Sequence, residues 1–97
     1  NHCQVPAHIA LEADTPRRSS EARLARMREL LAARAGKIDA AFLRDAYADS
    51  AGGALAICRN DYDGISTNAA SVITPETGEF WACAGVPDAP EKWERLL

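Results

Sequence analysis

The residue types best suited to chemistry cluster near the start of the chain. His2, Cys3 and His8 fall within the first eight residues. They could form a cysteine nucleophile with a histidine base, or they could ligate a metal ion. Adjacent residues of an extended segment point to opposite sides, and the sequence supplies neither a fourth ligand nor an orienting acid. The pattern therefore favours a loop whose polar side chains pack locally, and a small metal-binding protein is the weakest functional interpretation.

Arginines form the second candidate group. Six of them occur between positions 17 and 34: Arg17, Arg18, Arg23, Arg26, Arg28 and Arg34. An arginine can bind a carboxylate or a phosphate with two parallel hydrogen bonds, but most of these residues fit the solvated face of a helix better. Arg23 differs, because it lies one turn into a helix that Ser19 or Ser20 could cap. A cation is unfavourable near the positive end of the helix dipole, so we expect a specific partner for Arg23.

Two predicted helices at 19–49 position these arginines. Apolar side chains lie on one face of the first helix, at Leu24, Met27 and Leu31. Ser19 or Ser20 can cap its first amides, and Gly36 favours a left-handed termination. Asp39 is a good cap for the second helix.

Residues 54–85 predict three antiparallel strands. Apolar residues alternate at 54–58, and strand-forming residues return at Ala69–Thr74 and Glu79–Ala84, with a tight turn at 75–78. Helices followed by strands predict an α+β fold, in which two helices pack on one face of a three-stranded antiparallel sheet. The other face of this sheet must be covered by something outside these elements.

The ends of the chain are predicted to be irregular. Residues 1–18 form a loop with at most one short turn, and residues 86–97 form a tail with one turn of helix at 91–97. The sequence begins abruptly with Asn1 and without a methionine, which indicates a cut by processing, proteolysis or design.

Composition and charge exclude several classes of function. The net charge of −3 gives no basic excess for nucleic acid. No apolar run approaches the roughly 20 residues of a membrane span, and the first residues do not show the basic, apolar and small-residue order of a signal peptide. Cys3, Cys58 and Cys83 form no CxxC pair, which argues against a zinc site and for free thiols in a reducing compartment. We therefore expect a cytoplasmic protein without metal or cofactor.

Six short segments occur in a fixed order along the chain: N-H at 1–2, S-S-E-A-R-L-A-R at 19–26, L-R-D at 43–45, A-I-C-R at 56–59, S-V-I at 71–73 and G-V-P at 85–87. Together they resemble the C-terminal third of the isopenicillin N acyltransferase-like family. This family is related to the choloylglycine hydrolases within the N-terminal-nucleophile (Ntn) hydrolases. The resemblance covers nearly the whole chain, so residues 1–97 would be one C-terminal fragment of a larger domain.

The resemblance implies an αββα sandwich, in which two sheets pack face to face with helices outside. Family members are cut to expose an N-terminal cysteine, which attacks an amide or thioester carbonyl. The acyl group then passes to water or to an amine. Asn1 matches the family asparagine that stabilises the tetrahedral oxyanion, and Arg23 matches the arginine of the S-x-x-R segment, which lies close to the nucleophile.

The nucleophile itself would lie on another segment. An Ntn nucleophile must be the first residue, because its free amine serves as the base, and Asn1 has no nucleophilic atom. The implied partners are thus an upstream segment or subunit with the cysteine, and a small amide or thioester substrate that could be an acyl-CoA. Asn60 and Ala46 replace histidines that the family often has, which leaves the substrate open. The alternative is a non-catalytic α+β interaction module that forms a homo-oligomer through its exposed sheet face.

Overall fold

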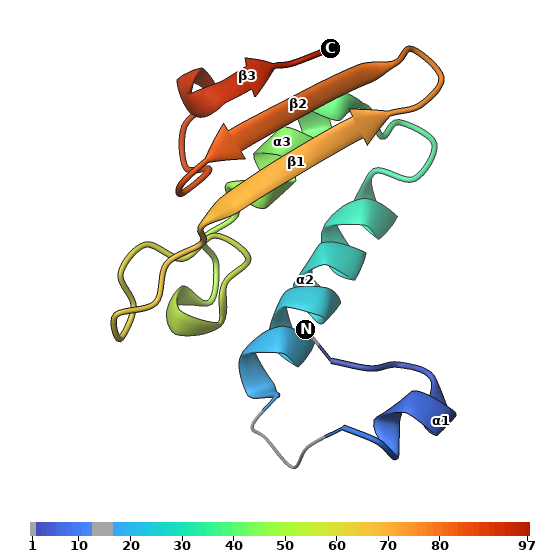
Figure 1. The fold of residues 1–97 in the computed structure, drawn as a ribbon, viewed down its shortest axis with the longest axis vertical. Helices are drawn as coiled ribbons and strands as arrows, with labels where there is room; N and C mark the ends of the chain where they lie inside the picture. Colours follow the sequence, from blue (N-terminus) through green and yellow to red (C-terminus); the bar gives the residue numbers. More distant parts are fainter. Residues whose placement is uncertain (1, 13–16) are drawn as a thin grey trace.

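The computed structural model of the 97-residue chain describes residues 2–12 and 17–97. Within this part, the elements are α1 (Pro6–Ile9), α2 (Arg18–Ala33), α3 (Ala40–Tyr47), the 3-10 turns η1 (Gly53–Leu55) and η2 (Pro90–Lys92), and the strands β1 (Ala69–Thr74), β2 (Glu79–Ala84) and β3 (Trp93–Arg95). The strands form one antiparallel sheet in the order β1-β2-β3 (Figure 1). The predicted α+β class with a three-stranded antiparallel sheet is therefore confirmed.

The hairpin of β1 and β2 forms at the bounds that the alternation predicts. Its register pairs Val72 with Trp81 and Ile73 with Phe80. The connecting turn contains Gly78, whose φ of 72° lies in the left-handed region that glycine tolerates. Because successive side chains of a strand point to opposite faces, Val72 and Ile73 lie on different sides of the sheet.

The strand predicted at 54–58 is wrong. Gly52 and Gly53 have positive φ values of 98° and 57°, and the chain turns through η1 instead of extending. The amide of Cys58 donates to the carbonyl oxygen of Asp49 at 2.8 Å, so this segment is bonded to the end of α3 and not to a strand. Two glycines with positive φ thus override the apolar alternation that follows them.

The third strand comes from the tail, where the sequence predicts a turn of helix at 91–97. Trp93 pairs with Cys83, and Arg95 pairs with Trp81. The Trp93 side chain is only 7% exposed and belongs to the core of the sheet. Burial of this large ring fixes the tail against the edge of β2, so the helical prediction is wrong, and a single 3-10 turn precedes β3.

The two long helices begin differently. α2 has Arg17 at its N-cap and no side-chain cap, so the predicted serine cap is wrong. Ser20 lies inside the helix and its Oγ is 2.6 Å from Nδ1 of His2, which ties the N-terminal segment to α2. α3 begins as predicted, because Oδ1 of Asp39 accepts a hydrogen bond at 2.8 Å from the amide three residues later.

The described N-terminal residues 2–12 contain one turn of helix, α1, where the sequence predicts a loop with at most one short turn. Pro6 occupies its first turn, where the fixed φ of proline suits a helix. Asn1 and residues 13–16 lie outside the described residues. No helix in the described ranges is both long and apolar enough to cross a membrane.

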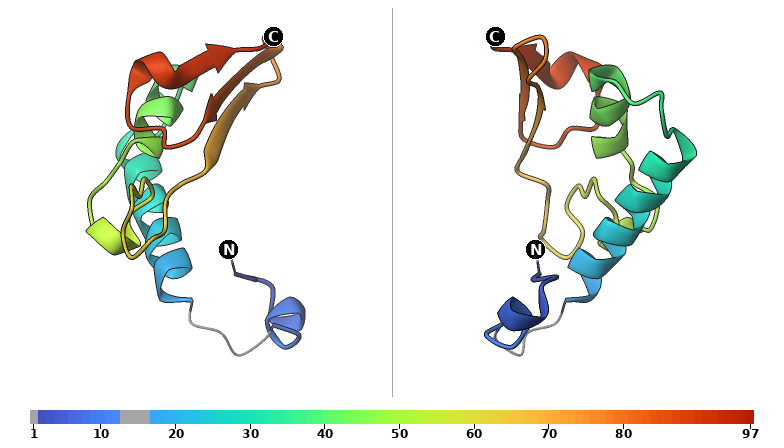
Figure 2. Two further views of the ribbon diagram at one scale, coloured as in Figure 1. Left: turned by 60° about the vertical axis from the view of Figure 1, so that its left-hand side comes forward. Right: turned by 90° about the vertical axis from the view of Figure 1, so that its right-hand side faces the viewer.

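Only one of the two predicted helices covers the sheet. Leu43 and Tyr47 of α3 pack on the core formed by Val72, Cys83 and Trp93. α2 packs chiefly against η1 and runs away from the sheet (Figure 2). The prediction of two helices on one sheet face is therefore corrected to one, because the glycine turn at η1, and not a strand, occupies the apolar side of α2.

The sheet face opposite α3 is apolar and exposed. Ile73 is 62% exposed and Leu96, directly after β3, is 53% exposed. Ile73 pairs with the half-buried Phe80, and the amide of Leu96 bonds to the carbonyl oxygen of Phe80. No described helix or strand lies over this side of the sheet (Figure 2). We call this surface, made of Ile73, Phe80 and Leu96, the open face.

Candidate functional site

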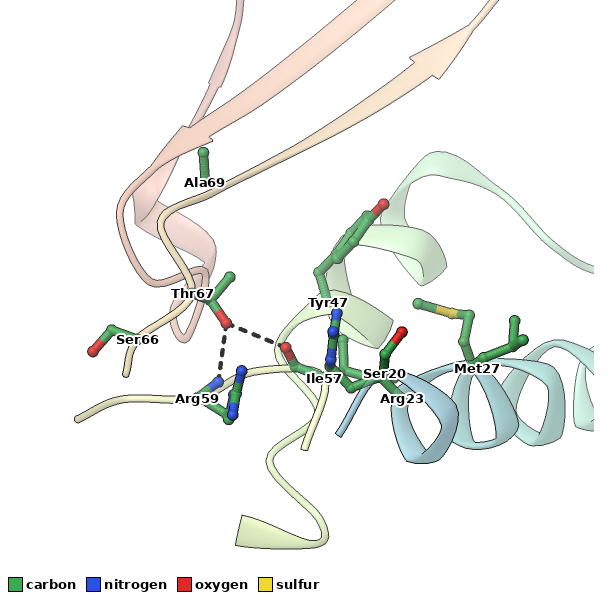
Figure 3. Close-up of a pocket in the computed structure, with 10 residues that line it drawn as sticks. Ser20, Arg23, Met27, Tyr47, Ile57, Arg59, Ser66, Thr67 and Ala69 are labelled. Atoms are coloured by element: carbon green, nitrogen blue, oxygen red, sulfur yellow. Dashed lines mark hydrogen bonds between the residues drawn. The ribbon is translucent and has the colours of Figure 1, made fainter. Parts of the chain in front are cut away.

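A cavity of about 430 Å³ lies between the first turns of α2, the end of α3 and the loop that leads into β1 (Figure 3). It is lined by Ser20, Arg23, Leu24, Met27, Tyr47, Ile57, Arg59, Ser66, Thr67 and Ala69. The lining thus combines two guanidinium groups with several hydroxyls and an apolar floor. This combination suits a small organic molecule with a polar or anionic group.

Arg23 is the sequence-predicted site residue that the structure places in this cavity. Its side chain is half-buried and its Nε donates to Ser19 Oγ at 3.4 Å, a long hydrogen bond. Among residues 2–12 and 17–97, no ion pair involves Arg23. By contrast, Arg26 on the same helix pairs with Asp49 at 2.7 Å. Arg23 therefore presents a positive charge to the cavity that no described carboxylate neutralises.

Arg59 faces the same cavity from the loop after η1. Its amide donates to Thr67 Oγ1 at 3.1 Å, and the Thr67 hydroxyl donates to the carbonyl oxygen of Ile57 at 3.2 Å (Figure 3). The guanidinium donates through Nη1 to the carbonyl oxygen of Ala54 at 3.0 Å. In the part of the chain that the structure describes, Arg59 also lacks a carboxylate partner.

The loop that bears Arg59 is closed on itself. The amide of Thr67 donates to the carbonyl oxygen of Arg59 at 2.9 Å, and Tyr62 and Ile65 exchange two backbone hydrogen bonds of 3.0 and 2.9 Å. Asp61 takes a φ of 57°, an uncommon value for a residue with a side chain. These bonds hold Arg59 and Thr67 in fixed positions at the cavity wall.

The N-terminal segment reaches the cavity through His2. Its ring bonds to Ser20, one of the lining residues, which lies one turn before Leu24 on α2. His2 is therefore tied to the same stretch of α2 that bears Arg23. Asn1 itself lies outside the described residues. Of the predicted pair, the structure therefore describes the surroundings of Arg23 alone.

The other group of candidate residues is not built for catalysis. The amide of Cys3 donates to Oε1 of Glu12 at 2.6 Å. Burial and the adjacent Glu12 raise the pKa of the Cys3 thiol, whereas an activated cysteine needs a lowered pKa. The described residues contain no group of three or more histidine, cysteine or acidic side chains that could hold a metal ion. Among the described residues, the contact that Cys3 makes is thus with Glu12, and His2 bonds to Ser20.

Sequence reasoning missed the role of the loop residues. Arg59 is part of the A-I-C-R segment, but its type alone gives it no partner, and Thr67 lies eight residues further along. The available signal was an arginine directly after an apolar run and before a polar loop. Arg59 and Thr67 are brought together after the chain turns at η1, where the sequence predicts a strand.

No protein-family model, curated protein or solved structure matches this chain. The cavity and its residues therefore carry the functional argument.

Proposed function

We propose that this chain is the C-terminal portion of a cysteine Ntn amidohydrolase or acyltransferase. The observation that carries the proposal is the position of Arg23. It matches the arginine of the resembled family, and it lines a cavity in which no described acidic group pairs with it. A half-buried charge without an ion-pair partner is more easily accommodated when a reacting group or a substrate compensates it.

The open face supports the same proposal at the level of architecture. An αββα sandwich needs a sheet with a helix on its outer side and an apolar inner side. Here α3 covers one side, and Ile73 and Leu96 are exposed on the other. A second sheet from an upstream segment would cover this side.

The resemblance supplies the proposed chemistry. The thiolate of the upstream cysteine attacks the carbonyl carbon of an amide or thioester, and the carbonyl oxygen becomes an oxyanion. The side-chain amide of Asn1 donates a hydrogen bond to that oxyanion. The α-ammonium group of the cysteine, which holds the proton taken from the thiol, protonates the departing amine or thiol as the tetrahedral intermediate collapses to an acyl-cysteine thioester. Water or an amine then attacks this thioester, its proton passes to the α-amine, and the cysteine is released with the acid or the new amide as product. Arg23 favours the thiolate form of the nucleophile or holds the substrate.

A second candidate function is a non-catalytic interaction module. The open face itself favours it, because exposed apolar side chains on a sheet also suit a second copy of the chain. The two proposals differ in what they require of Arg23, which has no place in a dimer formed through Ile73 and Leu96.

The test uses the complete gene product, expressed as a precursor. Intact-mass measurement with N-terminal sequencing should find a second chain that begins with cysteine. Hydrolysis of a panel of amides and acyl-CoA thioesters should then fall at least about 100-fold in Arg23→Gln, since electrostatic groups at reacting centres contribute on this order. Arg28→Gln, on the exposed side of the same helix, is the control and should keep wild-type activity. Full turnover in the Arg23 variant would contradict the role proposed for Arg23. Self-association with no turnover in any version would favour the interaction module.

A further inference from the structure

We propose that the cavity binds the carboxylate of a small organic acid between Arg23 and Arg59. Both guanidiniums line the same space of about 430 Å³, one from α2 and one from the loop before β1. Two elements that are distant in sequence thus bring two positive charges to one cavity. Two positive charges that line one space give it a positive potential, which favours an anionic ligand.

The charge balance of the neighbourhood supports an anionic ligand. Several acidic groups on or near α2 are engaged with other arginines: Glu12 and Glu21 with Arg17, and Glu29 and Asp49 with Arg26. In the ranges that the structure describes, no carboxylate forms an ion pair with Arg23 or Arg59. No described ion pair therefore neutralises the two guanidinium charges of the cavity, which favours an anionic ligand.

The donors in the wall fit an oxyanion. Arg59 is held by the bond from Nη1 to the carbonyl oxygen of Ala54, which leaves the other guanidinium N–H groups for a ligand. Ser66 adds a hydroxyl from the same loop. A guanidinium that is fixed before binding loses little side-chain entropy when it forms a fork with a carboxylate.

The remainder of the lining indicates what carries the carboxylate. Leu24, Met27 and Ile57 form an apolar floor beside the arginines, and Tyr47 contributes a ring. Such a floor suits a hydrocarbon or aromatic group better than a free inorganic ion. The ligand class is thus an apolar molecule with one carboxylate. This assignment deepens and rests on the proposed function where it names the substrate: an amide or thioester that also bears a carboxylate.

The binding test titrates N-benzoylglycine into the 97-residue chain, because every lining residue belongs to it. Arginine side-chain Nε–H signals are followed by NMR. The neutral N-benzoylglycinamide has the same shape and serves as the uncharged probe. We expect the acid to shift the signals of Arg23 and Arg59 and the amide to bind at least about tenfold more weakly.

Variants separate charge from shape. Arg59→Gln should weaken N-benzoylglycine binding by about tenfold or more, and Arg59→Lys should recover part of the loss because it keeps the charge without the fork. The Gln side chain keeps an N–H for the carbonyl of Ala54, and an unchanged backbone NMR spectrum checks that the loop is intact. Arg28→Gln removes a positive charge outside the cavity and should leave binding unchanged.

Several outcomes overturn the proposal. They are equal binding of the acid and the amide, no effect of Arg59→Gln, or binding of inorganic phosphate without binding of N-benzoylglycine. The outcomes also separate this inference from the proposed function. If N-benzoylglycine binds as expected but the complete gene product hydrolyses nothing, the carboxylate site stands and the catalytic proposal fails. If turnover requires Arg23 while N-benzoylglycine does not bind, the catalytic proposal stands and the carboxylate site is wrong.

Discussion

At the scale of single residues, charged side chains of one type have different roles within one helix. Arg26 makes two hydrogen bonds to Asp49, from Nε at 3.2 Å and from Nη2 at 2.7 Å, and links α2 to the end of α3. Arg23, three positions earlier, has no such link in the described chain and faces the cavity. The sequence could predict that Arg23 was unusual, since its place near the start of a helix is unfavourable. It could not predict the pairing of Arg26, because Asp49 is 23 residues away.

The Arg26–Asp49 pair gives a prediction about pH. The hydrogen bonds from Arg26 hold the pKa of Asp49 below its ordinary value, and the amide of Ala51 adds to the effect. A carboxyl with a lowered folded-state pKa stabilises the fold above its unfolded pKa of about 3.9, and this stabilisation is lost as the pH falls through the folded-state value.

We therefore expect Asp49→Asn to lower the free energy of unfolding by about 1 kcal/mol at pH 7 and to remove part of the acid sensitivity below about pH 4. Urea unfolding at pH 7 and pH 3 measures both effects. Glu29→Gln is the control, because Glu29 is 70% exposed and its bond to Arg26 is open to water. An equal loss of stability at both pH values in Asp49→Asn would contradict the assignment.

The three cysteines give a second prediction at this scale. All three are free, Cys58 and Cys83 are 4% and 1% exposed, and Cys3 is only half-buried. Burial also raises the pKa of the Cys58 thiol, which disfavours the reactive thiolate. Iodoacetamide at pH 8 should thus label Cys3 first, and Cys58 and Cys83 only after unfolding. Peptide mass spectrometry after short exposures would show the order, and early labelling of Cys83 would contradict the packing of the sheet core.

At the scale of elements, the sequence predicts a strand correctly where the apolar alternation and the turn residues agree. β1 and β2 were predictable because apolar alternation and a turn with Gly78 agree. The strand predicted at 54–58 is wrong because Gly52 and Gly53 adopt positive φ values, which the apolar alternation does not reveal. β3 has only three residues, and it forms because Trp93 is buried, which is a tertiary effect that no local pattern contains.

The two long helices differ in their N-caps, and this difference can be measured. Asp39 caps α3 through a 2.8 Å bond, whereas α2 has no side-chain cap. Asp39→Ala should therefore lower the free energy of unfolding by about 1 kcal/mol, and Ser19→Ala should change it by less than about 0.5 kcal/mol. Thermal and urea unfolding of both variants provide the values. A larger loss in Ser19→Ala than in Asp39→Ala would restore the serine cap that the sequence predicts.

At the scale of the whole molecule, the sheet has one covered and one open side. Val72 is 3% exposed under α3, whereas its neighbour Ile73 is 62% exposed on the open face. The sequence predicted that one face would need a cover, because apolar residues occupy both alternating sets of the hairpin. It could not identify the cover, since sandwich partners and second copies require the same apolar surface.

Substitution of these two neighbours tests what the open face does. In the 97-residue chain, Ile73→Lys should change the free energy of unfolding by less than about 0.5 kcal/mol, while Val72→Lys should lower it by more than about 2 kcal/mol. In the complete gene product, the proposed second sheet would bury Ile73, so Ile73→Lys should there become destabilising and reduce precursor processing. The test compares the effect of Ile73→Lys on the free energy of unfolding in the 97-residue chain with its effect in the complete gene product. If Ile73→Lys is neutral in both, nothing covers the open face and the sandwich is wrong. If it instead abolishes self-association of the short chain, measured by light scattering, the open face is a dimer surface.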